Sequence, residues 1–194
     1  MDISRQDAKE FLNQIDTVQN HTRKSIASSY DSGLLILWGL IWVTAFIGTH
    51  FFVARAFHIW TTLCGIGTII TVLVCRQQFR LGNPTKFSAA KKLGWRIFWF
   101  WISLFAYIFI WLSILVPRTG IQVNAFIITT IMFAYIVIGI WSASSYMIWL
   151  GAVVTCLTLI GFYLIPLSYY CLWMAVTAGG VLLGAGLYLR FCWR

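Results

Sequence analysis

All five acidic residues lie within the first 31 positions of this chain, and residues 32–194 contain no carboxylate side chain. In that remainder, apolar runs of membrane-spanning length alternate with short segments whose only charged residues are Lys and Arg. A charge at the centre of a bilayer costs about 2.5–3.5 kcal/mol on insertion scales, so spans embedded in lipid are expected to exclude Asp and Glu. The pattern predicts an all-α, polytopic helical bundle in a membrane, without the commonest proton relays and cation ligands in its spans.

The composition supports a membrane protein over a nucleic-acid-binding one. The chain is 60% hydrophobic and 10% charged, whereas soluble proteins are roughly 45–50% apolar and 25% charged. Its net charge of +9 has a simple origin in a multi-pass protein, because cytoplasmic loops accumulate Lys and Arg. We therefore expect the lipid bilayer as a partner and no nucleic acid.

Six stretches have the length of about 20 apolar residues that a membrane helix needs. A division at Pro166, Leu167 and Ser168 separates the last two, because proline and polar residues mark a helix boundary. We expect a cytoplasmic segment at residues 1–32 and a six-helix domain at 33–194. Its predicted spans are 33–54, 57–75, 97–116, 123–141, 146–165 and 169–189.

The distribution of Lys and Arg predicts the orientation. With the N-terminus inside, only Arg55 and Arg118 face outward, and all other basic residues face the cytoplasm, as the positive-inside rule requires. Both termini should then be cytoplasmic, and the spans should form three hairpins with very short outer turns. The twelve inner basic residues are Arg5, Lys9, Arg23, Lys24, Arg76, Arg80, Lys86, Lys91, Lys92, Arg96, Arg190 and Arg194.

Trp and Tyr side chains gather near the predicted span ends, as interfacial aromatic belts do. The belt reading is favoured over an aromatic ligand cage, because belts are general to membrane bundles. The expected inner belt comprises Trp95, Trp99, Trp141, Tyr146, Trp149, Tyr188 and Trp193. The expected outer belt comprises Trp60, Trp111, Tyr163, Tyr169, Tyr170 and Trp173.

The polar N-terminal segment forms a separate element. Ser4 and Asp7 resemble a capping box, and apolar residues then recur at helical spacing, so an amphipathic helix is predicted over residues 5–27. The segment lacks the basic start and apolar core of a cleavable signal peptide. Residues 1–27 could bind a cytoplasmic protein or form a homo-oligomer, or they could pack against the inner face of the bundle.

The longest loop, between the second and third spans, is basic. Contact with anionic lipid headgroups, at about 1 kcal/mol per basic residue near the surface, is its expected role. The residues concerned are Arg76, Arg80, Lys86, Lys91, Lys92 and Arg96.

Two histidines, His50 and His58, bracket the first outer turn. Two imidazoles at one depth are what a metal or haem site would need. No third ligand or carboxylate partner is available on that side of the membrane, so interfacial hydrogen bonding is the favoured reading. We expect no metal site and no cofactor.

Polar side chains near mid-depth are mostly hydroxyls, which join helices for about 0.6 kcal/mol each. Tyr107 and Tyr135 are the candidates for lining a polar cavity between the third and fourth spans. No predicted span contains an internal proline, and no pair of broken helices of the kind used by transporters is evident.

The last span carries the clearest packing signal. It contains a GxxxG pair, Gly180 and Gly184, and a small-xxx-small pair, Ala175 and Gly179, which allow another backbone to approach closely. Gly186 follows on the same helix. A partner helix within the same chain is favoured over one in a second protomer.

Three stretches resemble a group of small bacterial six-span proteins that have no assigned activity. They are LWGLIW at 37–42, AYIVIGIW at 134–141 and YYCLWMAVTAGGVLLGAGLYLR at 169–190. The resemblance implies a location in the bacterial cytoplasmic membrane, and it supplies no catalytic or ligand-binding residues.

Three functions remain open at this level. The leading hypothesis is a non-enzymatic, multi-pass membrane protein of structural, regulatory or accessory type with a cytoplasmic docking surface. A transporter or channel for a neutral or anionic small molecule is the alternative. The third is a membrane redox protein that uses His50 and His58.

Overall fold

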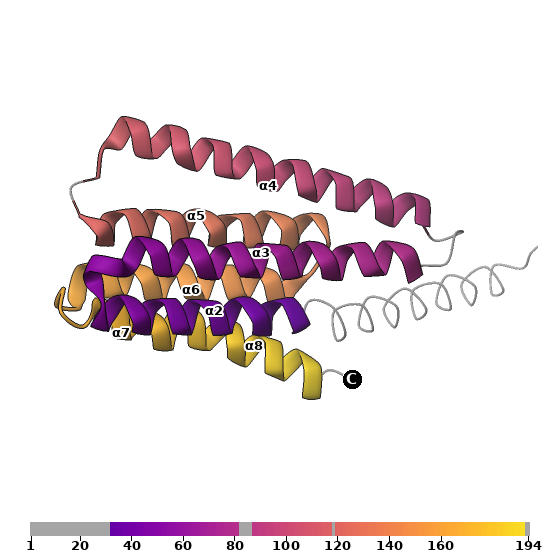
Figure 1. The fold of residues 1–194 in the computed structure, drawn as a ribbon. Coiled ribbons are helices and arrows are strands. Elements are labelled where there is room, and N and C mark those ends of the chain that lie inside the picture. The colour runs from indigo at the N-terminus through magenta and orange to yellow at the C-terminus, as the bar shows by residue number, and fades with distance from the viewer. Residues whose placement is uncertain (1–31, 82–86, 118, 193–194) are drawn as a thin grey trace, which may run out of the picture.

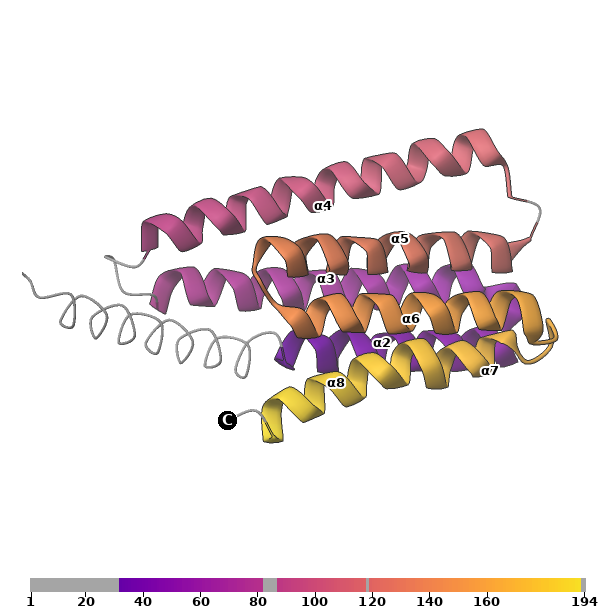
Figure 2. The same cartoon turned by 180° about the vertical axis from the view of Figure 1, so that it is seen from behind.

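The computed structural model describes residues 32–81, 87–117 and 119–192. This part of the chain is helical throughout, apart from short turns, and contains no strand. Figures 1 and 2 show its long helices lying roughly side by side in a single bundle. The elements are α2 (Ser32–Phe51), η2 (Val53–Arg55), α3 (Ala56–Leu81), α4 (Phe87–Leu115), α5 (Gly120–Trp141), α6 (Ser145–Leu164), α7 (Tyr170–Met174), the π-helical segment η3 (Ala175–Gly179) and α8 (Gly180–Phe191).

Six helices are long and apolar enough to cross a membrane, which confirms the predicted number. The last is built from α7, η3 and α8 together and is called the last span below. The start of α2 and the end of α8 lie at the same end of the bundle (Figures 1 and 2). The predicted helix at 5–27 lies outside the described residues, as does Lys86.

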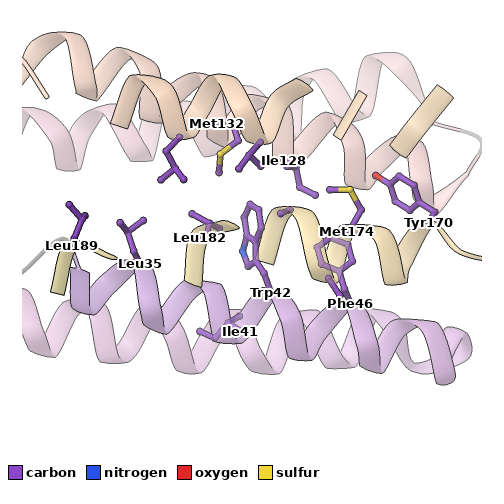
Figure 3. Close-up of a cluster of buried hydrophobic side chains, with 14 residues drawn as sticks. Leu35, Ile41, Trp42, Phe46, Ile128, Met132, Tyr170, Met174, Leu182 and Leu189 are labelled. Atoms are coloured by element: carbon purple, nitrogen blue, oxygen red, sulfur yellow. The ribbon is translucent and has the colours of Figure 1, made fainter. Parts of the chain in front are cut away.

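The core lies among α2, α5, α6 and the last span. Side chains from these helices meet in a continuous apolar cluster (Figure 3). Phe46, Met132, Val154, Met174 and Leu182 are each at most 1% exposed. Large apolar side chains therefore fill the centre of the bundle.

The remaining two long helices are peripheral. α3 packs against α2, and α4 packs against α5. Among the residues of α3 and α4 whose burial is described, only Gly67 and Ile108 are buried. Most of the surface of these two helices is therefore available to lipid or to other membrane proteins.

Glycines allow the last span to approach α2 closely. A Cβ atom added to Gly39 would lie 2.6 Å from the backbone nitrogen of Leu183. A Cβ on Gly179 would lie 2.8 Å from the Val43 nitrogen. Real Cβ atoms do not approach backbone atoms so closely, so these contacts depend on the missing side chains. Backbone proximity of this kind is how membrane helices associate when lipid tails are as apolar as Leu.

Glycines also allow α5 and α6 to pack closely against each other. A Cβ on Gly151 would lie 2.6 Å from the carbonyl oxygen of Met132, and one on Gly139 would lie 3.0 Å from the nitrogen of Ile148. The turn between these helices is tight, with Ser144 N donating to Gly139 O at 2.8 Å and Ala143 at a positive φ of 51°. The glycine contacts and the short turn together fix this helix pair.

Candidate functional site

A hollow of about 200 Å³ opens at the end of the bundle that also holds η2. It lies where α5 begins, α6 ends and the last span begins. Its described lining carries no charged side chain. The lining residues are Thr119, Ile121, Gln122, Phe162, Ile165, Leu167 and Tyr170.

Tyr170 is the distinctive residue of this hollow. It is 2% exposed, and its hydroxyl oxygen is buried without a hydrogen-bond partner. In Figure 3 its ring points from the start of the last span into the bundle. The side-chain oxygen of Asn124, in the second turn of α5, is also buried without a partner. Buried polar groups are normally hydrogen-bonded, so these two buried oxygens are exceptions within the part of the chain that the structure describes.

The α5 side of the hollow is shaped by a capping box. Gln122 N donates to Thr119 Oγ1 at 3.3 Å, and Thr119 N donates to Gln122 Oε1 at 3.3 Å. This reciprocal pair satisfies two backbone donors that the first turn of a helix leaves unpaired. It fixes the start of α5 beside the hollow.

The opposite side is shaped by the turn into the last span. Tyr169 N donates to Pro166 O at 2.9 Å, and Trp173 Nε1 donates to Leu157 O of α6 at 3.0 Å. Gly161 leaves room for the Trp173 ring, because a Cβ there would lie 2.5 Å from the ring. These contacts hold the start of the last span against α6 and place Tyr170 inside.

The lining limits what this site can do chemically. A tyrosine hydroxyl can donate one hydrogen bond and accept others. The surrounding Ile, Leu and Phe side chains contribute apolar surface. The described lining is therefore mainly apolar, with Thr119 and Gln122 as its other polar residues.

The histidines lie beside aromatic neighbours. The His50 ring lies 5.1 Å from that of Phe51, and the His58 ring lies 5.8 Å from that of Phe57, both edge to face. His58 is exposed and His50 is half-buried. Within the described residues, no group of three or more His, Cys, Asp or Glu side chains could hold a metal ion.

The two candidate cavity tyrosines have different surroundings. Tyr107 is 62% exposed on α4 and so faces away from the core. Tyr135 is half-buried, and its ring lies 6.5 Å from that of Trp101 in an edge-to-face arrangement. Neither lines the hollow described above.

The small residues of the last span divide between two faces. Ala175 and Gly179 are buried, and Gly179 contacts α2. Gly184 is exposed, and a Cβ added to it would have no atom within 4 Å. A Cβ added to Gly180 would meet only the carbonyl oxygen of Ala175, in the same span, at 3.8 Å. Gly186 also contacts α2, because a Cβ added there would lie 2.8 Å from the backbone nitrogen of Ile36.

The basic residues of the loop region lie at the end of the bundle opposite η2. Arg76 near the end of α3 and Arg96 in α4 are exposed. Arg80 lies in the last turns of α3, and Lys91 and Lys92 lie in the first turns of α4. Arg55 belongs to η2 at the other end.

Sequence reasoning missed the roles of two positions in the packing of the bundle. Gly39 is one of three glycines in α2, and its only signal in the sequence was a glycine without a turn to explain it. Tyr170 was placed in the aromatic belt with Tyr169, because nothing in the sequence separates the two neighbours.

The chain matches no family model, no curated protein and no solved structure.

Proposed function

We propose that this protein is a non-enzymatic, multi-pass membrane protein of structural or accessory type, which acts by binding other molecules at its surface. In this proposal it lies in the bacterial cytoplasmic membrane with both termini inside and its spans arranged as three hairpins. The observation that carries the proposal is the apolar centre of the bundle, filled by Phe46, Met132, Met174 and Leu182.

The hydroxyl groups within the core helices support this reading. Thr129, Thr155, Thr158 and Thr177 each donate to a carbonyl oxygen of their own helix at 2.7–2.8 Å. A hydroxyl bonded in this way has no donor left for a solute. These bonds therefore favour a structural role for the four hydroxyls over a role in lining a transport path.

The peripheral position of α3 and α4 also supports binding at the surface. Each packs against one core helix and leaves most of its length uncovered. Basic residues lie at the loop end of these two helices, where they would contact anionic headgroups. Residues 1–27 are proposed as the adjoining cytoplasmic docking element.

Deletion of residues 1–27 tests the docking element. We expect the shortened protein to insert into the membrane and to keep its melting temperature, because the described core begins at Ser32. We expect it to lose its oligomer or its co-purifying partner, as measured by light scattering and affinity purification.

A matched control replaces residues 1–27 with a flexible Gly/Ser segment of equal length. This control retains chain length and removes the apolar face, so it should behave like the deletion. Unchanged association in both variants would contradict the proposed docking role.

A further inference from the structure

We propose that the exposed face of α4 around Ser103 and Tyr107 is the contact surface between two copies of this chain in the membrane. The two α4 helices would lie side by side and parallel, with hydroxyl groups hydrogen-bonded across the interface. This inference rests on the proposed function, because it names one partner that binds at the surface. It does not involve residues 1–27.

The first argument is the depth of the Tyr107 hydroxyl. The apolar span in α4 runs from Gly94 to Leu115. Because a helix rises about 1.5 Å per residue, Tyr107 lies about 12 Å from the nearer end of that span. Side chains on a helix lean toward its N-terminus, which here is toward the middle of the span. When this span crosses a membrane, the hydroxyl therefore lies in the hydrocarbon, away from headgroups and water.

The second argument is that two hydroxyls on this face lack partners. Tyr107 is 62% exposed, Ser103 is exposed, and neither side chain hydrogen-bonds to any residue that the structure describes. By contrast, Ser113, exposed on the same helix, donates to the carbonyl oxygen of Phe109 at 2.9 Å. Lipid tails cannot supply a hydrogen bond, and an unpaired hydroxyl in hydrocarbon is costly. A neighbour with its own polar group at the same depth removes that cost.

The third argument is the shape and place of this face. Residues three and four apart share one side of a helix, so Ser103, Ala106, Tyr107 and Ile110 lie together, and all four are exposed. α4 packs against α5 on another side, where Ile108 is buried. Figures 1 and 2 show α4 along the edge of the bundle. The small side chains of Ser103 and Ala106 allow another helix to approach closely.

The fourth argument identifies the neighbour as a second copy. Copies with the same distribution of Lys and Arg insert in the same orientation, so a second α4 presents Ser103 and Tyr107 at the same depth. Each hydroxyl can donate and accept a hydrogen bond. Tyr107 of one copy can therefore pair with Ser103 of the other, and twofold symmetry repeats the bond. The same surface supplies both sides of the interface.

The test is disulfide cross-linking of single cysteines in native membranes, in the full chain without its own cysteines. Ser103→Cys and Ile110→Cys lie on the proposed contact face. The matched control is Phe105→Cys, because Phe105 is exposed on α4 only two residues from Ser103 but on another side of the helix. After oxidation with copper phenanthroline, we expect a dimer on non-reducing gels for positions 103 and 110 and a monomer for position 105.

A second measurement tests the hydroxyl group itself. The dissociation constant of the dimer in detergent micelles is measured by energy transfer between labelled copies. Two symmetric interhelical hydrogen bonds of average strength correspond to about sevenfold in affinity, so Tyr107→Phe should weaken association by about that factor. The matched control is Tyr163→Phe, which changes an exposed tyrosine near the end of α6 and should associate like the original protein.

The outcomes separate this inference from the proposed docking element. Absence of a cross-link at position 103, equal cross-linking at 103 and 105, or unchanged association of Tyr107→Phe would overturn the contact through α4. Lipid or a different membrane protein would then cover this face, and docking through residues 1–27 would be unaffected. If deletion of residues 1–27 changes no association while positions 103 and 110 still cross-link, the docking element is wrong and the contact through α4 is supported.

Discussion

Gly39 of α2 lies directly against the backbone of Leu183 in the last span. An added Cβ would be 2.6 Å from the Leu183 nitrogen and 2.8 Å from its Cα. These are backbone atoms, which cannot move aside as the end of a flexible side chain can. The contact therefore sets the distance between the first and last spans of the bundle.

Substitution of Gly39 should reduce stability. The Gly39→Ala variant must separate α2 from the last span, and overpacking of this kind costs about 1–3 kcal/mol. Reversible unfolding in mixed micelles of mild detergent and increasing SDS measures the free energy of unfolding.

Gly184→Ala is the matched control for this prediction. Gly184 lies on a helix in the same interface but has open space around it, so the added methyl group meets nothing. Its stability should stay the same or rise by up to about 1 kcal/mol from helix propensity. Equal losses in the two variants would show that the contact at Gly39 is not specific.

The glycines of the last span show what the sequence could and could not predict. The number of spans followed from the length of the apolar runs, because hydrocarbon thickness sets helix length. The choice of contact face did not, because the lipid-facing side of a membrane helix is as apolar as its packed side. Gly184 and Gly186 are two residues apart, yet one faces outward and the other contacts α2.

The candidate site illustrates the same limit. The turn at residues 166–168 was predictable from Pro166 and Ser168, and the structure has α6 ending at Leu164 and α7 beginning at Tyr170. Tyr169 and Tyr170 were indistinguishable as boundary aromatics. Only the packing of the last span against α2 and α6 makes Tyr170 buried.

A hydrogen bond between α2 and α3 should contribute measurably to stability. Trp38 Nε1 donates to Thr71 Oγ1 at 3.2 Å, while the Thr71 hydroxyl donates to Gly67 O at 2.8 Å. Interhelical hydrogen bonds in membranes average about 0.6 kcal/mol. A double-mutant cycle with Trp38→Phe and Thr71→Val should give a coupling energy near that value.

The control cycle replaces Thr71→Val with Thr68→Val. Thr68 lies one turn away on the same helix and donates to Cys64 O at 2.8 Å within α3. Its coupling to Trp38 should be close to zero. A coupling as large as that of Thr71 would mean that the measured effect is not this hydrogen bond.

The capping box at the start of α5 gives another prediction. Thr119→Ala removes the side-chain acceptor for Gln122 N and should cost about 0.5–2 kcal/mol. Hydrogen exchange of the backbone amide of Gln122 should accelerate, because that donor loses its partner. Thr119→Ser keeps the hydroxyl and should exchange slowly, and fast exchange there would rule out the capping hydroxyl as the cause.

The proposed orientation places Arg55 and Leu167 on the outer side of the membrane and Gln77 and Ser145 on the inner side. All four residues are exposed and lie near helix ends. The decisive measurement is labelling of single cysteines at these positions, in a protein without its own cysteines, by a membrane-impermeant thiol reagent. Cysteines at 55 and 167 should react in intact cells, and those at 77 and 145 only after permeabilisation. Reaction of positions 55 and 77 under the same condition would contradict the account.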